Sequence, residues 1–327
     1  MQTYNTAEFC FPNINTSCRK TRLDHSELIY SVLSCISLLT VSLNLLVIIS
    51  ISHFRQLHTT TNILLLSLAV TDFLVGLMQM PAEMLLLQGC WILGDLLCTA
   101  GFFLGFISIN ASTGNMVLIS VDRYIAICDP MFYSTKVTLR RVQFCICVCW
   151  IFSAVHSSWI MRDLLKQPGR YNSCYGECVM VINYIEGAVD LCVSFFAPIL
   201  VVVVLYVRIF VVAVSQARAM RSHVAAAAQQ RSKTKTAKKS EMKAARTLGV
   251  VVVVFLLCFC PYYSFTVAAE NNSIAASTAA SQIWLMYINS CLNPLIYAFF
   301  YPWFRKSIKQ IVTFQILKPD SSDTNIL

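Results

Sequence analysis

Residues 99–127 read TAGFFLGFISINASTGNMVLISVDRYIAI, and no charged residue interrupts the 23 positions before Asp122. A predominantly apolar run of this length is enough to cross the ~30 Å hydrocarbon core of a bilayer as an α-helix. The helix is also the form in which a lone segment satisfies its own backbone hydrogen bonds in lipid. The stretch therefore predicts a transmembrane helix that ends in charged residues at one membrane surface.

Six further stretches on either side of this one are apolar over a comparable length. The seven stretches run over about 28–52, 63–87, 99–127, 144–161, 179–214, 248–269 and 281–300. We therefore expect an all-α membrane protein whose main domain, residues 28–300, is a bundle of seven transmembrane helices. The N-terminal segment 1–27 is polar and has no signal-peptide pattern, and residues 301–327 are expected to form an amphipathic helix and a tail.

Composition excludes several other classes of protein. Hydrophobic residues make up 57% of the 327 residues and charged residues only 13%, about half the charged share of a soluble globular domain. A soluble enzyme is therefore excluded. Ten glycines and nine prolines are too few for a collagen-like or disordered chain. Many of the 15 cysteines lie inside the apolar stretches, where cysteine behaves as a small hydrophobic residue.

The distribution of lysine and arginine predicts the orientation in the membrane. With the N-terminus outside, 19 of the 25 basic residues fall on the cytoplasmic side and six outside. Cytoplasmic loops carry the excess of basic residues, so the N-terminus is expected outside and the C-terminus inside. The net charge of +9 is thus a topology signal and does not indicate nucleic-acid binding. The basic third cytoplasmic loop, residues 216–247, could anchor on anionic lipid and also form a partner-binding face.

Several polar residues lie at membrane depth, where they are costly and therefore suggest function. Asp72 lies in the middle of the second stretch and Asn44 near the middle of the first, while the seventh contains Asn289, Asn293 and Tyr297. These groups could meet in one hydrated core in which the Asp72 carboxylate holds a small cation such as sodium. A purely structural hydrogen-bond network is the alternative.

Prolines in the fifth, sixth and seventh stretches predict kinked helices, because proline removes a hydrogen bond of the helix. They are Pro198, Pro261 and Pro294. Aromatic residues flank Pro261 in the sixth stretch, and such residues pack into a membrane core more often than they line a ligand pocket.

Cysteines outside the apolar stretches are candidates for disulfides, since the extracellular space is oxidising. A bridge from Cys98 to Cys178 would pin the loop before the fifth helix across the mouth of the bundle. Cys174 is then left to pair with either Cys10 or Cys18 in the N-terminal segment.

Two glycosylation sequons lie on the side predicted to be extracellular. They begin at Asn15 and at Asn271. We favour Asn15, because the second sequon is in a short loop close to the membrane.

At this point the residues resemble the landmarks of rhodopsin-like G-protein-coupled receptors, in order and over all seven helices. The landmarks are Asn44, Asp72, Asp122-Arg123-Tyr124, Trp150, Pro198, Cys258-Phe259-Cys260-Pro261 and Asn293-Pro294-Leu295-Ile296-Tyr297. The resemblance implies a ligand site open to the outside and a heterotrimeric G protein as the cytoplasmic partner. It also implies that Asp122 neutralises Arg123 until that partner draws the arginine away.

Longer motifs are similar to those of trace amine-associated receptors. They are FCFPNINTSCRKT (9–21), HFRQLH (53–58), KAARTLG (243–249) and NSCLNPLIYAFFYPWFRK (289–306). That family senses amines, mostly as olfactory receptors that raise cyclic AMP through a stimulatory G protein. Its second disulfide joins the N-terminus to the loop before helix five, which would select Cys18 and Cys174. Phe259 departs from the family, which usually has tryptophan there.

The third helix contains the departure with the largest consequence. Aminergic relatives carry an aspartate seventeen residues before the aspartate of Asp-Arg-Tyr, where it pairs with the ligand ammonium, but this chain has Gly105. An ammonium entering a pocket still needs a buried anion. The fifth stretch offers Asn183, Glu186, Asp190 and Ser194 at spacings of one helical face. It resembles the fish branch of the family, in which the amine-binding aspartate has moved to helix five.

We therefore expect a multi-pass plasma-membrane receptor, without enzyme activity or cofactor, in which Asp190 binds the ligand ammonium. Glu186 could receive a second amine or simply face water. The carbon chain would lie against aromatic residues that add cation–π attraction, namely Phe259, Tyr262, Tyr263, Trp284 and Tyr287. Whether the ligand is a monoamine or a diamine depends on the shape of the pocket.

Three rival functions remain. One is a rhodopsin-like receptor for a non-amine ligand. The second is a polytopic transporter, which should show inverted repeats, and none are visible. The third is an intramembrane enzyme, for which the stretches lack paired metal ligands.

Overall fold

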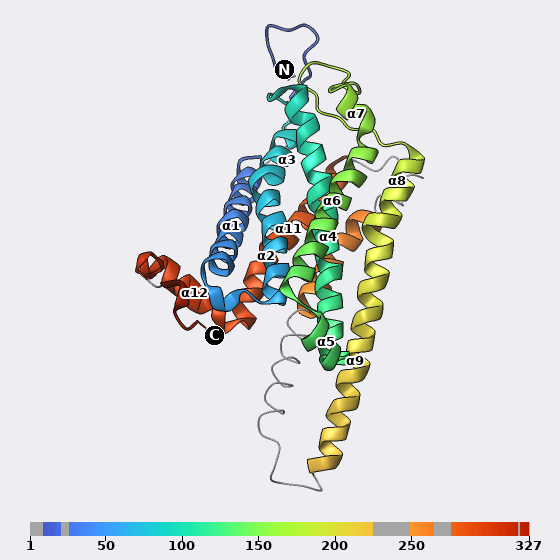
Figure 1. Ribbon diagram of the computed structural model, residues 1–327. Coiled ribbons are helices and arrows are strands. Elements are labelled where there is room, and N and C mark those ends of the chain that lie inside the picture. Colours follow the sequence, from blue (N-terminus) through green and yellow to red (C-terminus); the bar gives the residue numbers. More distant parts are fainter. Residues whose placement is uncertain (1–8, 21–25, 225–248, 265–275, 320, 327) are drawn as a thin grey trace.

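A computed structural model shows an all-helical protein in which long helices pack side by side (Figure 1). It describes residues 9–20, 26–224, 249–264, 276–319 and 321–326. Six of the described helices are long and apolar enough to cross a membrane, and Gly249–Ser264 is a shorter apolar helix. These are the seven helices that the sequence predicts. The Asn271 sequon and most of the basic loop 216–247 lie outside the described residues.

The helices of the bundle follow the predicted stretches closely. Their bounds are α1 Ser26–His53, α2 Thr60–Leu74 with α3 Met80–Leu87, α4 Gly94–Cys128, α6 Leu139–Ile160, α8 Tyr184–Leu191 with α9 Ala197–Val224, the helix Gly249–Ser264, and α11 Ala276–Phe300. Shorter helices connect or follow them, namely η1 Arg55–Leu57, α5 Pro130–Lys136, α7 Arg162–Lys166, α12 Pro302–Val312, η4 Gln315–Leu317 and η5 Ser321–Asp323. Large apolar side chains such as Leu28, Phe144, Leu200 and Phe299 are exposed on the outer faces, as expected for helices that face lipid.

The fifth transmembrane helix begins later than its apolar stretch. Residues 179–183 are not helical, and α8 starts at Tyr184. Asn183 accepts a hydrogen bond from the backbone N–H of Glu186 at 2.9 Å, and the Glu186 side chain accepts one from the Asn183 backbone in return. This reciprocal capping box stabilises the first turn and sets where the helix begins. Hydrophobicity alone could not locate that boundary.

Within the described parts of the chain, two transmembrane helices contain a π-helical turn, and a proline follows each turn. Val75–Gln79 joins α2 to α3 just before Pro81, and Cys192–Phe196 joins α8 to α9 just before Pro198. A proline ring clashes with the carbonyl four residues earlier and supplies no N–H, so the preceding turn widens. Pro198 therefore acts through a π turn that rotates Asp190 and its neighbours relative to α9, while Pro294 lies inside α11.

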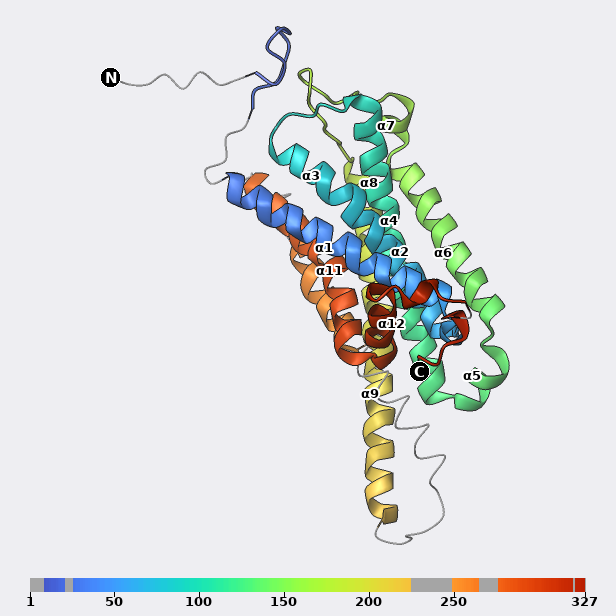
Figure 2. The same ribbon diagram turned by 90° about the vertical axis from the view of Figure 1, so that its left-hand side faces the viewer.

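Past the end of α11, the chain turns into α12, which lies beside the end of α1 (Figures 1 and 2). Arg305 donates to the carbonyls of Ala298 at 2.8 Å and Phe299 at 3.0 Å. Those carbonyls have no partner within α11, and a cation at a helix C-terminus is favourable. Trp303 and Phe304 of α12 are buried, so this helix presents its apolar face to the bundle.

Three disulfides gather at the opposite end of the bundle, which we call the disulfide end. Cys98–Cys178 and Cys18–Cys174 are the pairs expected from the sequence and the family resemblance, and Cys10–Cys90 is a third that the sequence analysis missed. The N-terminal segment also pairs with the loop before α8, because Cys18 N–H donates to Tyr175 O and Tyr175 N–H donates to Thr16 O. The segment 9–20 is thus held at the disulfide end.

Removing the third disulfide should lower the stability of the receptor in detergent by ~3 kcal/mol. The other two bridges already connect Cys10 to Cys90 through short stretches of 8, 4 and 8 residues, so the relevant loop is far shorter than the sequence separation of 80. Thermal denaturation of Cys10→Ser, Cys90→Ser and the double variant should give equal losses, with Cys35→Ser as the control. Additive losses in the double variant would contradict the pairing.

Candidate functional site

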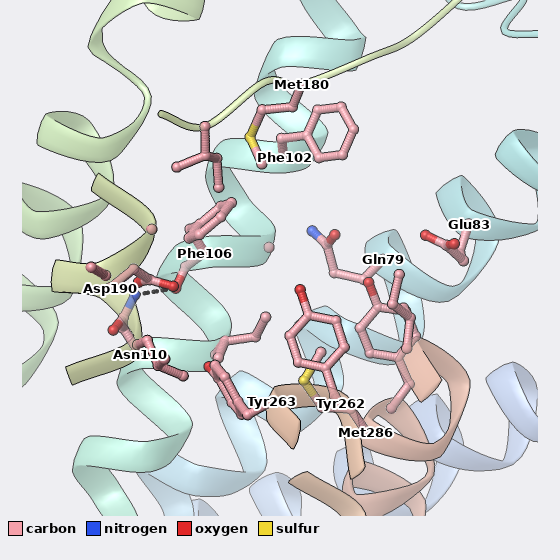
Figure 3. Close-up of a pocket in the computed structure, with 18 of the residues that line it drawn as sticks. Gln79, Glu83, Phe102, Phe106, Asn110, Met180, Asp190, Tyr262, Tyr263 and Met286 are labelled. Atoms are coloured by element: carbon pink, nitrogen blue, oxygen red, sulfur yellow. Dashed lines mark hydrogen bonds between the residues drawn. The ribbon is translucent and has the colours of Figure 1, made fainter. Parts of the chain in front are cut away.

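A cavity of about 590 Å³ lies inside the bundle toward the disulfide end (Figure 3). Its walls come from the π turn Val75–Gln79, α3, α4, the segment before α8, α8, the helix Gly249–Ser264 and α11. Pockets for small molecules span ~300–1,000 Å³ and combine apolar walls with a few polar groups. This cavity has that size and that composition, with two carboxylates, Asp190 and Glu83, among its lining residues.

Asp190 lies at the end of α8, on one side of the cavity with Asn110 (Figure 3). The Ser194 hydroxyl is 2.7 Å from a carboxylate oxygen of Asp190 and also 2.7 Å from the amide oxygen of Asn110. A hydroxyl has one proton, so it can donate to only one of the two acceptors at a time. Asp190 is therefore a half-buried anion with capacity for a further donor.

His156 on α6 is the basic group nearest to Asp190. Its Nδ1 lies 3.8 Å from the Asp190 carboxylate, beyond hydrogen-bond distance, and neither ring nitrogen has a hydrogen-bond partner among the described residues. His156 does not line the cavity. An internal ion pair with His156 is thus the structural alternative to a ligand-binding role for Asp190.

The Gln79 side chain occupies the position that an aspartate would need at Gly105. A Cβ built at Gly105 would lie 2.9 Å from the Gln79 side-chain oxygen, and the Gln79 amide donates to the Gly101 carbonyl at 3.1 Å. The usual aminergic anchor is therefore absent, and its space is filled. A carboxylate introduced at position 105 would first have to displace Gln79.

The aromatic residues expected around the ligand divide into two groups. Tyr262, Tyr263 and Tyr287 line the cavity. Phe259 instead stacks on Phe255 with ring centroids 4.2 Å apart, and Trp284 is buried, and neither of them lines the cavity. The cavity wall is nevertheless rich in aromatic faces that can contact a cation.

Glu186 was considered as a site for a second amine or as a side chain that faces water, and its contacts match neither role. It forms an ion pair with Arg162 and belongs to the capping box of α8. It is buried and does not line the cavity, although it borders a shallow depression with Trp159 and Arg162. Its carboxylate is therefore already neutralised, one helical turn away from Asp190.

Other carboxylates at the disulfide end also have partners. Asp95 accepts a hydrogen bond from the Asn172 amide at 2.9 Å. Glu177 accepts from the backbone and the hydroxyl of Ser173. Partial burial acts to raise the pKa of Glu177, but the hydrogen bonds from Ser173 outweigh it and hold the pKa below its usual value. Asp190 and Glu83 differ from these groups because they face the cavity.

The sequence analysis did not select Glu83 as a ligand-binding residue, although it lies in the cavity wall. It is half-buried on α3, across the cavity from Asp190 (Figure 3). The signal in the sequence was its position in the second apolar stretch, eleven residues after Asp72. This position did not indicate which side of the helix Glu83 would face, because the π turn at Val75–Gln79 rotates the helix between the two residues.

At the opposite end of the bundle, Asp122 and Arg123 form a buried pair. Asp122 accepts hydrogen bonds from Arg123 Nε at 3.0 Å, from the Thr61 hydroxyl at 2.9 Å and from the Tyr133 hydroxyl at 3.0 Å. Tyr124, the third residue of the motif, packs with Ile127 and Ile209 of α9. Arg123 is thus held against α2 and α5 through its neighbouring carboxylate.

The polar residues of the first, second and seventh helices also meet. Asn293 donates to the Asp72 carboxylate at 2.8 Å, and Asn44 donates to the carbonyls of Thr40 and Ser290, each at 2.9 Å. Five side-chain oxygens here have no hydrogen-bond partner among the described residues, namely Asn44 Oδ1, Asp72 Oδ1, Asn289 Oδ1, Asn293 Oδ1 and the Tyr297 hydroxyl. Buried oxygens of this kind require water or a cation.

Asn15 lies in the N-terminal segment at the disulfide end, and its side chain is exposed, so it is accessible for the attachment of a glycan.

Comparison with known proteins gives the family. The model of the 7 transmembrane receptor (rhodopsin family) matches residues 43–297. Trace amine-associated receptor 13c of Danio rerio is 37% identical over 99% of this chain and 98% of its own. Trace amine-associated receptor 9 is 40% identical in Rattus norvegicus and 41% in Mus musculus, over 98% of this chain and 97% and 94% of theirs. The chain therefore belongs to the rhodopsin-type seven-transmembrane receptors of the plasma membrane, which are not enzymes, and among them to the trace amine-associated receptors.

Proposed function

We propose that this protein is a receptor for amines whose ammonium group binds Asp190. The observation that carries the proposal is a carboxylate with spare acceptor capacity in the wall of an aromatic-lined cavity. With Gly105, the third helix has no anion at the position of the usual anchor, and Asp190 supplies a carboxylate in the wall of the same cavity. The names of the relatives associate them with trace amines.

We propose that the disulfide end is extracellular and the Arg123 end cytoplasmic. Disulfides form and persist in oxidising compartments, so three of them at one end support this orientation. The excess of basic residues on the other side supports it independently. The amine then enters the cavity from outside, and a glycan on Asn15 would also be outside.

Signalling is proposed to pass to a stimulatory G protein and to raise cyclic AMP. Amine binding would favour a packing in which the helix Gly249–Ser264 moves outward near Pro261 and Arg123 becomes free to meet the G protein. The ligand can drive this change only by binding that packing better. The oxygens around Asp72 and Asn293 fit a sodium ion. The ion would stabilise the packing seen in the structure, in which Arg123 is held by Asp122.

The test is cyclic AMP accumulation in cells that express the chain. We expect amines to raise cyclic AMP in a dose-dependent way, and neutral alcohols of the same shape to be inactive, because they lack the charge that Asp190 binds. Cells with the empty vector are the control. A response to the alcohols at similar concentrations would favour a receptor for non-amine ligands, and uptake of labelled amine without cyclic AMP would favour a transporter.

A further inference from the structure

We propose that Glu83 is a second ammonium subsite, and that the cavity therefore selects a linear diamine over a monoamine. The inference rests on the proposed amine-receptor function and specifies its ligand class. In it, one ammonium binds Asp190 on α8, the other binds Glu83 on α3, and the methylene chain spans the cavity between them.

The first argument is the placement of the two carboxylates. Both line the same cavity, and Figure 3 shows Asp190 on one side and Glu83 on the other, with Gln79 and Tyr262 between them in that view. The helix α4 packs against both the α2–α3 helix and the α8–α9 helix, so it stands between the helices that bear them. Neighbouring helix axes are ~8–10 Å apart, and a single ammonium cannot contact acids that are two helices apart.

The second argument is the absence of any counter-charge at Glu83. Among the described residues, Glu83 has no hydrogen bond or ion pair, and no lysine, arginine or histidine lines the cavity. Asp190 has only a shared hydroxyl and a histidine at 3.8 Å. Two acids facing one apolar cavity are costly to ionise unless cations neutralise them. A molecule with two ammonium groups supplies both cations.

The third argument is the surface between the two acids. Phe106, Ile283, Met286 and the ring faces of Tyr262 and Tyr287 contribute to the cavity wall. A polymethylene chain would bury its apolar surface there, and the aromatic faces would attract the charged ends.

Glu186, the other candidate for a second anion, does not compete with Glu83. It is paired with Arg162 and lies outside the cavity. The fifth helix thus offers one anchor, and the second comes from across the cavity.

The test compares α,ω-diamines of increasing chain length with the monoamines of equal length, by cyclic AMP dose–response at matched surface expression. In the wild type, we expect the best diamine to be more potent than its monoamine by at least ~10-fold, which corresponds to ~1.4 kcal/mol. Glu83→Gln should remove that preference by weakening the response to the diamine alone. Glu27→Gln removes an exposed carboxylate at the start of α1, outside the cavity, and should change neither response.

A shorter acid gives a readout that general damage to the fold would not produce. Glu83→Asp withdraws the carboxylate by one methylene group, so the preferred diamine should become longer. Loss of potency for diamine and monoamine alike in Glu83→Gln would assign Glu83 a structural role and overturn the inference. An unchanged diamine preference would overturn it as well.

The same experiment separates the two proposals. If Asp190→Asn weakens both ligands while Glu83→Gln affects neither, the amine-receptor function stands and the diamine inference fails. If no amine activates the wild type, or Asp190→Asn changes nothing, both fail.

Discussion

Asparagine in place of Asp190 should shift the dose–response curve of the best amine to concentrations ~30-fold to several thousand-fold higher. Asparagine keeps the size and polarity of the side chain and removes only the charge. Truncating one side of a desolvated charge pair costs ~2–5 kcal/mol, and every ~1.4 kcal/mol is tenfold in affinity. The Ser194 hydroxyl can still donate to an amide oxygen at this position, so the local contacts persist.

Two matched variants make this measurement specific. Asp163→Asn carries the same chemical change on α7, outside the cavity, and should leave the curve in place. His156→Gln tests the alternative, in which Asp190 serves mainly to pair with His156 at 3.8 Å. Equal shifts in His156→Gln and Asp190→Asn would favour that internal pair, and a shift of less than threefold in Asp190→Asn would show that Asp190 is not the anchor.

The seven helices could be predicted from sequence because a bilayer imposes one length and one hydrogen-bonding solution on every crossing segment. Helix boundaries that depend on side-chain contacts were harder to predict from the sequence. The start of α8 depends on the reciprocal cap between Asn183 and Glu186, and hydrophobicity does not report it. The same cap, with Arg162, takes Glu186 out of the ligand site that its spacing suggested.

Tertiary packing also decided what the sequence could not say about the cavity. Gly105 indicated in the sequence that the usual anchor is missing, but only the structure shows that the Gln79 side chain fills the space beside Gly105. Glu83 is eleven residues from Asp72 in the chain, and a π turn between them determines which way it faces. Cys90 lay outside the apolar stretches and had a partner in Cys10, yet spacing carries no information on connectivity. Each of these contacts joins residues that are distant in sequence or separated by irregular turns.

Alanine in place of Arg123 should leave amine binding intact and abolish the rise in cyclic AMP. Arg123 is held at the end of the bundle opposite the disulfides, in contact with Asp122 and Thr61, and it does not line the cavity. Loss of its charge leaves Asp122 buried with hydrogen bonds from Thr61 and Tyr133 but without a cation, so some loss of stability is also expected. Radioligand binding and cyclic AMP should therefore be measured on the same membranes, normalised to surface expression.

Asparagine in place of Asp122 should increase signalling, whereas Arg123→Ala should abolish it. Opposite effects of two changes in the same cluster cannot both come from a general loss of folding. Asparagine can keep one of the two hydrogen bonds from Thr61 and Tyr133, because these residues donate to different carboxylate oxygens and an amide has only one oxygen, and it no longer neutralises the arginine. A hydrogen bond to a charged group contributes ~1.5–3 kcal/mol, so its weakening should raise the population of the released state by ~10-fold or more. Because a ligand only shifts an equilibrium that already exists, this variant should produce cyclic AMP without amine and respond to lower amine concentrations. If Asp122→Asn is as silent as Arg123→Ala while both bind amine normally, the carboxylate does not restrain Arg123, and its contacts serve the fold alone.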